Sequence, residues 1–108
     1  MTNLQNKEIT IHNDFNKYDW SSAYNNVDIE LDKQTLPLSK GTTIKELNGT
    51  LYRNGPGILE RDGQWVHHPF DGDGMITAIK FEDGNVSISN KFVRTKGFIE
   101  EQKLNKFI

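Results

Sequence analysis

Apolar and polar residues alternate over short stretches in the second half of the chain. The clearest stretch is 75–81, where apolar side chains occupy most of the odd positions and most of the even positions. A strand with two largely apolar faces is typical of the inside of a sheet that is covered on both sides. Residues 75–81 therefore predict a central strand.

Further strand patterns surround this one and are separated by glycine-rich turns. We expect strands at 50–53, 58–60, 65–67 and 86–93, and a short half-exposed strand at 27–32. Turns are expected at 54–57, 61–64 and 82–85, the last around an Asp-Gly pair that favours a hairpin. No helix of convincing length is expected. The pattern predicts an all-β meander of short antiparallel strands.

A dense turn signal, Asp71-Gly72-Asp73-Gly74, comes directly before the central strand. Glycine tolerates positive φ and aspartate bonds nearby backbone N–H groups, so we expect a tight corner here. The two aspartates and Glu82 also imitate the spacing of a calcium loop. Such a loop needs an oxygen ligand and a glycine where this chain has Met75 and Ile76. We interpret the run as a structural turn.

Residues 1–48 are more polar and less regular than the rest, so we divide the chain into an arm, 1–48, and a strand-rich part, 49–108. Four aromatic residues gather in the arm: Phe15, Tyr18, Trp20 and Tyr24. We expect them to pin the arm to a larger body, because chain termini stay disordered unless they are tied down. Docking on a membrane surface is the alternative, and the lack of a basic face disfavours it.

Composition limits the kinds of partner that the protein can bind and indicates its cellular compartment. The formal net charge is −2 and no Lys/Arg stripe is present, so we expect no nucleic-acid partner. The chain has no cysteine, which excludes a disulfide framework and a thiolate zinc site. No apolar run approaches the ~18 residues of a membrane span and no signal sequence opens the chain. We expect a cytoplasmic protein.

Three motifs occur in order along the strand-rich part. They are Gly-Thr-Leu-Tyr-Arg-Asn-Gly-Pro-Gly at 49–57, His-Pro-Phe-Asp-Gly-Asp-Gly-Met at 68–75 and Lys-Phe-Val-Arg-Thr at 91–95. In wording and spacing they resemble the carotenoid cleavage oxygenases, the iron-dependent enzymes related to the retinal pigment epithelium isomerase. The resemblance covers about residues 38–108.

The resemblance implies a seven-bladed β-propeller, of which residues 49–108 would form the first strands. It implies Fe(II) on the propeller axis, held by four histidines that glutamates orient. The intact enzyme would use O2 to split a C=C bond of a carotenoid or apocarotenoid into carbonyl products, and isomerisation remains open as the other reaction of this family. Any peripheral membrane contact would come from regions outside these residues.

The chain's own histidines do not supply such an iron site. There are three, His12, His67 and His68, and the last two are neighbours that would project from opposite faces of a strand. The resemblance places the iron ligands and their glutamates in later blades. We expect no catalytic residue, metal ligand or bound cofactor within the 108 residues, and no activity from this chain alone.

Roles can be suggested for five residues of the motifs. Phe70 is a candidate lining residue of an apolar substrate tunnel, with plain packing as an equal alternative. Arg53 and Arg94 lie in the flanking motifs, with Asp71 and Asp73 between them in sequence. We expect at least one buried Arg–carboxylate pair among these four to staple the strands.

The last nine residues of the chain, 100–108, carry two further predictions. Glu100 and Glu101 are interpreted as a solvated strand edge, since neighbours on a strand diverge. Lys106-Phe107-Ile108 finishes on two large apolar residues, which favours a sheet cut short and an isolated chain that is marginally stable or prone to aggregate. The alternative function is a self-contained small β domain that binds an apolar isoprenoid without catalysis.

Overall fold

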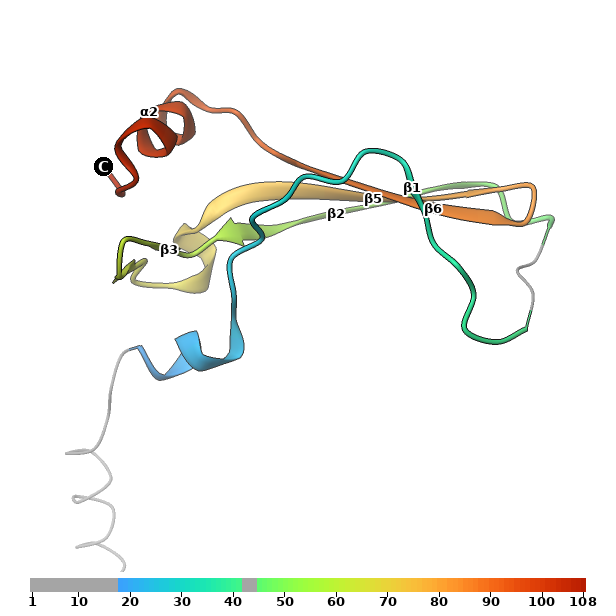
Figure 1. Ribbon diagram of the computed structural model, residues 1–108, viewed down its shortest axis with the longest axis horizontal. Coiled ribbons are helices and arrows are strands. Elements are labelled where there is room, and N and C mark those ends of the chain that lie inside the picture. Colours follow the sequence, from blue (N-terminus) through green and yellow to red (C-terminus); the bar gives the residue numbers. More distant parts are fainter. Residues whose placement is uncertain (1–17, 42–44) are drawn as a thin grey trace, which may run out of the picture.

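The computed structural model describes residues 18–41 and 45–108, which consist mainly of antiparallel strands (Figure 1). One sheet has the order β1-β6-β5-β2, with β1 (Gln34–Thr35), β2 (Gly49–Ile58), β5 (Asp73–Glu82) and β6 (Asn85–Phe92). A hairpin of β3 (Glu60–Arg61) and β4 (Gln64–Trp65) continues from the end of β2. The described part also contains the 3-10 turns η1 (Asp19–Ala23) and η2 (Pro69–Asp71) and the α-helix α2 (Lys96–Leu104).

The central strand predicted at 75–81 is confirmed as part of β5. It pairs with β2 from Gly49↔Phe81 to Ile58↔Asp73, and with β6 along its other edge. The expected cover is concentrated at one end: Met75 is buried, whereas positions 76–81 are half-buried. The sheet is therefore packed most tightly where β5 begins.

The hairpin predicted at 82–85 is confirmed, and a second hairpin forms across the turn predicted at 61–64; each turns on an Asp-Gly pair. Asp83 and Gly84 have φ values of 52° and 82°, and Asp62 and Gly63 have values of 49° and 82°. Positive φ at both central residues matches the right-handed twist of the strands on either side. In the β3–β4 hairpin the Val66 N–H also donates to the Leu59 carbonyl at 3.0 Å, which extends the pairing beyond β4.

The turn predicted at 54–57 was wrong, because these residues continue β2. Pro56 lies opposite Gly74, and the register shifts between Pro56 and Ile58. Gly57 is buried, and a Cβ there would come within 2.5 Å of the Phe92 ring. A glycine inside a strand can mark close approach of a neighbour instead of a turn, and this one does.

The strand predicted at 27–32 was also wrong, since the ladder in this region is β1 at Gln34–Thr35. The segment crosses the sheet from η1 towards β1 (Figure 1). It makes separate hydrogen bonds: Val27 N–H donates to the Gly57 carbonyl at 2.7 Å, and Asn90 N–H donates to the Leu31 carbonyl at 3.0 Å. The Asn90 side chain accepts from Leu31 N–H, so a side chain takes the place of a ladder partner.

Helix α2 contradicts the expectation that no substantial helix follows the strands. Thr95 caps it, because its Oγ1 accepts from the Phe98 N–H at 3.0 Å. The helix ends at Asn105, whose φ of 51° is the left-handed conformation common just past a helix. Residues 96–104 were therefore misassigned.

The core lies where α2 meets the end of the sheet. Ile58, Met75, Phe92 and Phe98 form one buried cluster, and Phe107 is half-buried against it. The rings of Phe92 and Phe98 are stacked with centroids 5.0 Å apart. Over the described residues, no helix has the length and apolar character needed to cross a membrane.

Candidate functional site

The three sequence motifs meet at this packed end of the sheet. Gly57 of the first motif lies against Met75 of the second and Phe92 of the third. Val93 N–H donates to the Gly74 carbonyl at 2.9 Å, which joins the third motif to the second. Residues as far apart in the sequence as Gly57 and Phe92 thus build one rigid corner.

The turn η2 is held by the histidine that precedes it. His68 Nδ1 accepts from the Phe70 N–H at 3.1 Å, and Pro69 occupies the first position of the turn. The rings of His68 and Phe70 meet edge to face with centroids 4.8 Å apart. His68 is therefore a capping residue in this structure.

Gly72 and Gly74 do not have the positive φ expected of them; Gly72 has φ −66°. Gly72 is instead a point of close approach. A Cβ at this position would lie 2.7 Å from Leu59 Cδ2, 2.8 Å from the Ile58 carbonyl oxygen and 2.9 Å from Pro56 Cβ. The corner is tight because η2 packs directly on the end of β2.

Phe70 is 88% exposed at the rim of this corner. It lines a pocket of about 240 Å³ together with parts of β2 and the glycines that follow η2: Asn54, Gly55, Pro56, Gly72 and Gly74. This volume is slightly below the ~300–1,000 Å³ of typical small-molecule sites. An exposed aromatic ring beside a small pocket is compatible with a place in a larger apolar passage, and the tunnel role of Phe70 remains a prediction.

A buried Arg–carboxylate pair staples the strands, but its arginine is Arg61. The Arg61 Nη2 atom lies 2.8 Å from Asp73 Oδ2, and the Arg61 side chain is 4% exposed. The predicted partners are corrected accordingly: Arg53 is exposed on β2 opposite Thr77, and Asp71 is exposed in η2. Arg61 escaped notice because it stands beside the Asp62-Gly63 turn, where a solvated side chain is the usual expectation.

Arg94 forms its ion pair with Glu30. A Glu30 carboxylate oxygen also accepts from the Phe92 N–H at 2.8 Å. The hydrogen bond from Arg94, followed by the one from the Phe92 backbone, lowers the pKa of Glu30 below its usual 4.5. The third motif is thereby attached to the segment that crosses the sheet.

Glu101 was misassigned to a solvated strand edge. It lies on α2, and its side chain is 12% exposed, whereas Glu100 is exposed. Burial raises the pKa of Glu101 above its usual 4.5, and a hydrogen bond with Asp73 and the charge of Asp73 raise it further. The predicted acid neighbours are therefore in different environments.

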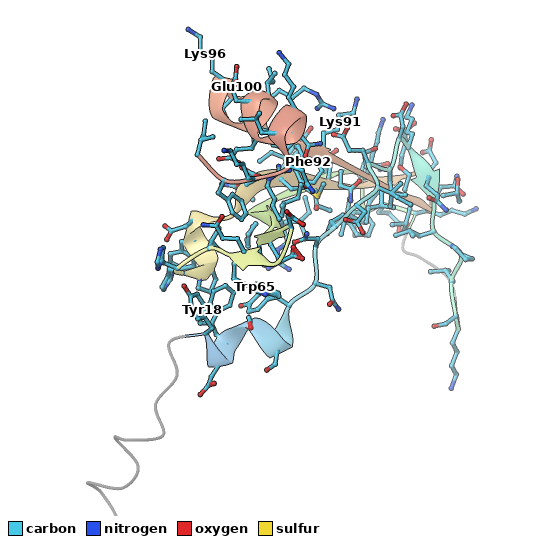
Figure 2. All side chains as sticks on the ribbon, turned by 60° about the vertical axis from the view of Figure 1, so that its left-hand side comes forward. Tyr18, Trp65, Lys91, Phe92, Lys96 and Glu100 are labelled. Atoms are coloured by element: carbon cyan, nitrogen blue, oxygen red, sulfur yellow. The ribbon has the colours of Figure 1, made fainter. Side chains whose placement is uncertain are left out.

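The aromatic residues of the arm pack on the β3–β4 hairpin. The Trp20 ring meets the Trp65 ring edge to face, with centroids 5.9 Å apart, and meets Tyr24 similarly at 5.7 Å. Figure 2 shows Tyr18 at the start of η1 and Trp65 on the hairpin that faces η1. The predicted pinning by aromatics is confirmed for Trp20, and Phe15 lies outside the described residues.

The donor set does not fit a four-histidine iron site. The His67 ring lies 6.3 Å from the Tyr18 ring, and His68 Nδ1 is already used by η2. His12 lies outside the described residues. Residues 18–41 and 45–108 contain no group of three His, Cys, Asp or Glu arranged to hold a metal ion. Asp73 and Glu82 stand at opposite ends of β5, so they do not close a calcium loop.

The chain resembles known proteins over most of its length. The family model described as retinal pigment epithelial membrane protein matches residues 24–108. The apocarotenoid-15,15'-oxygenase of a Synechocystis strain is 47% identical over 95 residues, which is 87% of this chain and 19% of that protein. The probable chloroplastic carotenoid cleavage dioxygenase 4 of Arabidopsis thaliana is 38% identical over 78 residues, or 70% of this chain and 11% of that protein.

The fold agrees with this likeness. The solved structure of a point mutant of the Synechocystis apocarotenoid oxygenase superposes with a TM-score of 0.74 at 46% identity. The superposition covers 87% of this chain and 20% of that chain. The 108 residues thus span about a fifth or less of the length of these relatives.

Proposed function

Because the chain belongs to the retinal pigment epithelial membrane protein family of carotenoid oxygenases, we propose that it forms part of a carotenoid or apocarotenoid cleavage oxygenase. The intact enzyme would be a seven-bladed β-propeller that uses O2 and Fe(II) to split a C=C bond of its polyene substrate into carbonyl products. The observation that carries the proposal is the 47% identity over 95 residues to an apocarotenoid oxygenase.

The role proposed for these residues is structural. Iron, when bound, would activate O2, and its ligands would be histidines outside this chain, because the histidines described here do not fit the site. The chain's own contribution is the rigid corner made by η2, the end of β2 and the start of β5. Held on this corner, Phe70 would present its ring to an apolar substrate passage.

A graft tests the proposal. Residues 24–108 would replace the matching segment of the Synechocystis apocarotenoid oxygenase, and loss of polyene absorbance, O2 uptake and iron content would be measured. We expect the graft to keep its iron and its cleavage activity, and the 108-residue chain alone to bind no stoichiometric iron and consume no O2. Oxygen-consuming turnover by the lone chain, or a folded, iron-loaded graft without activity, would overturn the proposal.

Two substitutions in the graft separate the roles of its residues. His67→Gln should leave the iron content unchanged, since this histidine is not a ligand in the proposal. Phe70→Ala should raise KM for the apocarotenoid by removing apolar contact with the substrate, and an unchanged KM would exclude the tunnel role. Binding of an apocarotenoid by the lone chain without chemistry would favour the small isoprenoid-binding domain instead.

The remaining parts of the proposal concern partners and location. The intact enzyme would take a carotenoid or apocarotenoid and O2 and would not bind nucleic acid. It would reside in the cytoplasm, with any peripheral membrane contact made by regions outside this chain. Fractionation of cells that produce the tagged protein measures this, and recovery in a secreted fraction would contradict it.

A further inference from the structure

Arg61 joins three elements at the buried end of the molecule. From β3 its guanidinium reaches Asp73 on β5, with Nη2 2.8 Å from Oδ2, and Gln102 on α2, with Nη1 2.8 Å from Oε1. Two aromatic rings flank the guanidinium carbon, at 6.0 Å for Phe98 and 5.6 Å for Phe107. One buried cation therefore links α2 to the strands, beside the apolar packing of Phe98.

Glu101 brings a second carboxyl group to the same cation. Its Oε2 lies 3.8 Å from Arg61 Nε, beyond hydrogen-bond distance, and both atoms are buried without a hydrogen-bond partner. The strong bonds of Arg61 go to Asp73 and Gln102. Glu101 is thus the carboxyl group that the guanidinium leaves least compensated.

The charges facing this site do not balance when every group is ionised. Arg61 supplies one positive charge, Asp73 and Glu101 supply two negative charges, and Gln102 is neutral. The Ile108 backbone and the charge of Arg61 act in the opposite direction to burial and lower the pKa of Glu101, but they are the smaller causes. The other charged residues of this helical region, Glu100, Lys103, Lys96 and Lys106, are exposed, and Figure 2 shows Glu100 and Lys96 on the outer side of α2. An extra buried negative charge is costly, and a proton on Glu101 removes it.

We propose that α2 is a proton-dependent latch, in which a proton on the buried Glu101 carboxyl group keeps the helix docked on Arg61. The protonated Glu101 donates to Asp73, and the site is then neutral. Loss of the proton leaves two carboxylates on one guanidinium and weakens the attachment of α2.

The direction of the pH effect follows from Glu101. Burial, followed by the hydrogen bond and charge of Asp73, raises its pKa in the docked state above 4.5. A group with a raised pKa contributes its full stabilisation below its undocked pKa and loses it as the pH rises through the docked pKa. Acid therefore closes the latch, and rising pH loosens it.

Release of α2 would have a local structural result. Phe98 would leave its stacked position on Phe92 and uncover the buried cluster that includes Met75. The paired strands β2, β5 and β6 do not depend on α2 for their ladders. Opening would thus be confined to α2 and its contacts.

Amide hydrogen exchange of the whole 108-residue chain tests the latch, at about pH 5 and about pH 8 and with correction for the intrinsic exchange rate. We expect protection of α2 to fall with pH, about tenfold for each unit by which docking raises the pKa of Glu101, while β5 and β6 stay protected. Glu101→Gln keeps the side-chain shape and a donor, so its α2 should be equally protected at both pH values. Glu100→Gln, one residue away and exposed, is the matched control and should behave as the unsubstituted chain.

Three results would overturn the latch: pH-independent protection of α2 in the unsubstituted chain, the same pH dependence in Glu101→Gln and Glu100→Gln, or loss of protection in β5 in step with α2. If Glu101→Gln fails to fold, a carboxyl carbon NMR titration of the unsubstituted chain decides. A Glu101 midpoint above 4.5 supports the protonated Glu101 of the latch, and one at or below 4.5 refutes it.

Discussion

Gly72 and Gly74 are two residues apart in the same motif, yet they should respond in opposite ways to a single added methyl group. A Cβ on Gly72 would lie within 3.0 Å of Leu59, of the Ile58 carbonyl oxygen and of Pro56. A Cβ on Gly74 would meet only ordinary contacts, the nearest being Val93 Cγ2 at 3.7 Å. Neither glycine has positive φ, so alanine is not excluded by backbone conformation at either position.

The size of the difference follows from the contacts. Replacing glycine by alanine restricts the unfolded chain and stabilises by about 0.4–1 kcal/mol where the native conformation allows it. This gain applies to both variants and cancels in their difference. What remains is the overpacking at Gly72, about 1–3 kcal/mol, because one of the crowded atoms is a backbone oxygen that no rotamer change can move.

Urea unfolding followed by tryptophan fluorescence measures both variants, since Trp65 lies in the hairpin that follows β2. We expect Gly72→Ala to be less stable than the unsubstituted chain, and Gly74→Ala to be equal or more stable. In thermal unfolding the gap corresponds to roughly 4–8 °C for each kcal/mol. Equal midpoints for the two variants, or a less stable Gly74→Ala, would show that the close approach at Gly72 does not hold the corner.

Three further substitutions test other contacts. Arg61→Ala should destabilise the chain by about 3–5 kcal/mol because it leaves a buried carboxylate without its cation. Arg53 is exposed, so Arg53→Ala should change the free energy of unfolding by no more than about 0.5 kcal/mol. Similar urea midpoints for the two variants would contradict the staple. The Asn26 side chain accepts hydrogen bonds from the backbone N–H groups of Leu59 and Glu60 and donates one to the Glu60 carbonyl, and Asn26→Ala removes all three. The free energy of opening residues 59–66 should fall by about 1–3 kcal/mol, which hydrogen exchange measures. Unchanged exchange in these residues would refute the role of Asn26. Because Arg94 lowers the pKa of Glu30, this pair contributes stability above pH 4.5 that is lost as the pH falls through the lowered pKa. In Arg94→Gln the free energy of unfolding should fall less steeply with acid, as urea unfolding at several pH values measures. The same pH dependence as in the unsubstituted chain would argue against the pair.

Local patterns predicted the strands and hairpins well, because their determinants are short-range. An Asp-Gly pair between two strand patterns supplies two residues that accept positive φ, as a two-residue hairpin requires, and such hairpins form at Asp62 and Asp83. The apolar run at 75–81 became β5, an inner strand that pairs with β2 and β6, although its faces are fully buried only at Met75.

The misassigned elements depend on contacts that the sequence does not display. The sequence around Gly57 is typical of a turn, and only the structure shows that the Phe92 ring packs closely against this glycine. The helix α2 has only nine residues, and Phe98 stabilises it by stacking on a strand that is not part of its own pattern. The Thr95 cap was the local signal that could have revealed it.

The site shows the same division between local and distant causes. The motif at 68–75 pointed to the corner correctly, since the turn, its cap and its glycines are neighbours in sequence. The buried ion pair was expected among the wrong arginines, because Arg61 acquires its partners from β5 and α2, 12 and 41 residues further along the chain. Burial, and not residue type, distinguishes Arg61 from Arg53.

The segment that crosses the sheet has a consequence for the order of assembly. Its bonds span long separations, 33 residues from Asn26 to Leu59 and 64 from Glu30 to Arg94. Closing such loops costs more chain entropy than forming the β5–β6 hairpin, which is local and should form within microseconds. On a ribosome, residues 26–31 therefore leave the exit tunnel early, yet Asn26 must wait until Leu59 has been made and Glu30 until Arg94 has been made, so this early segment completes its docking late.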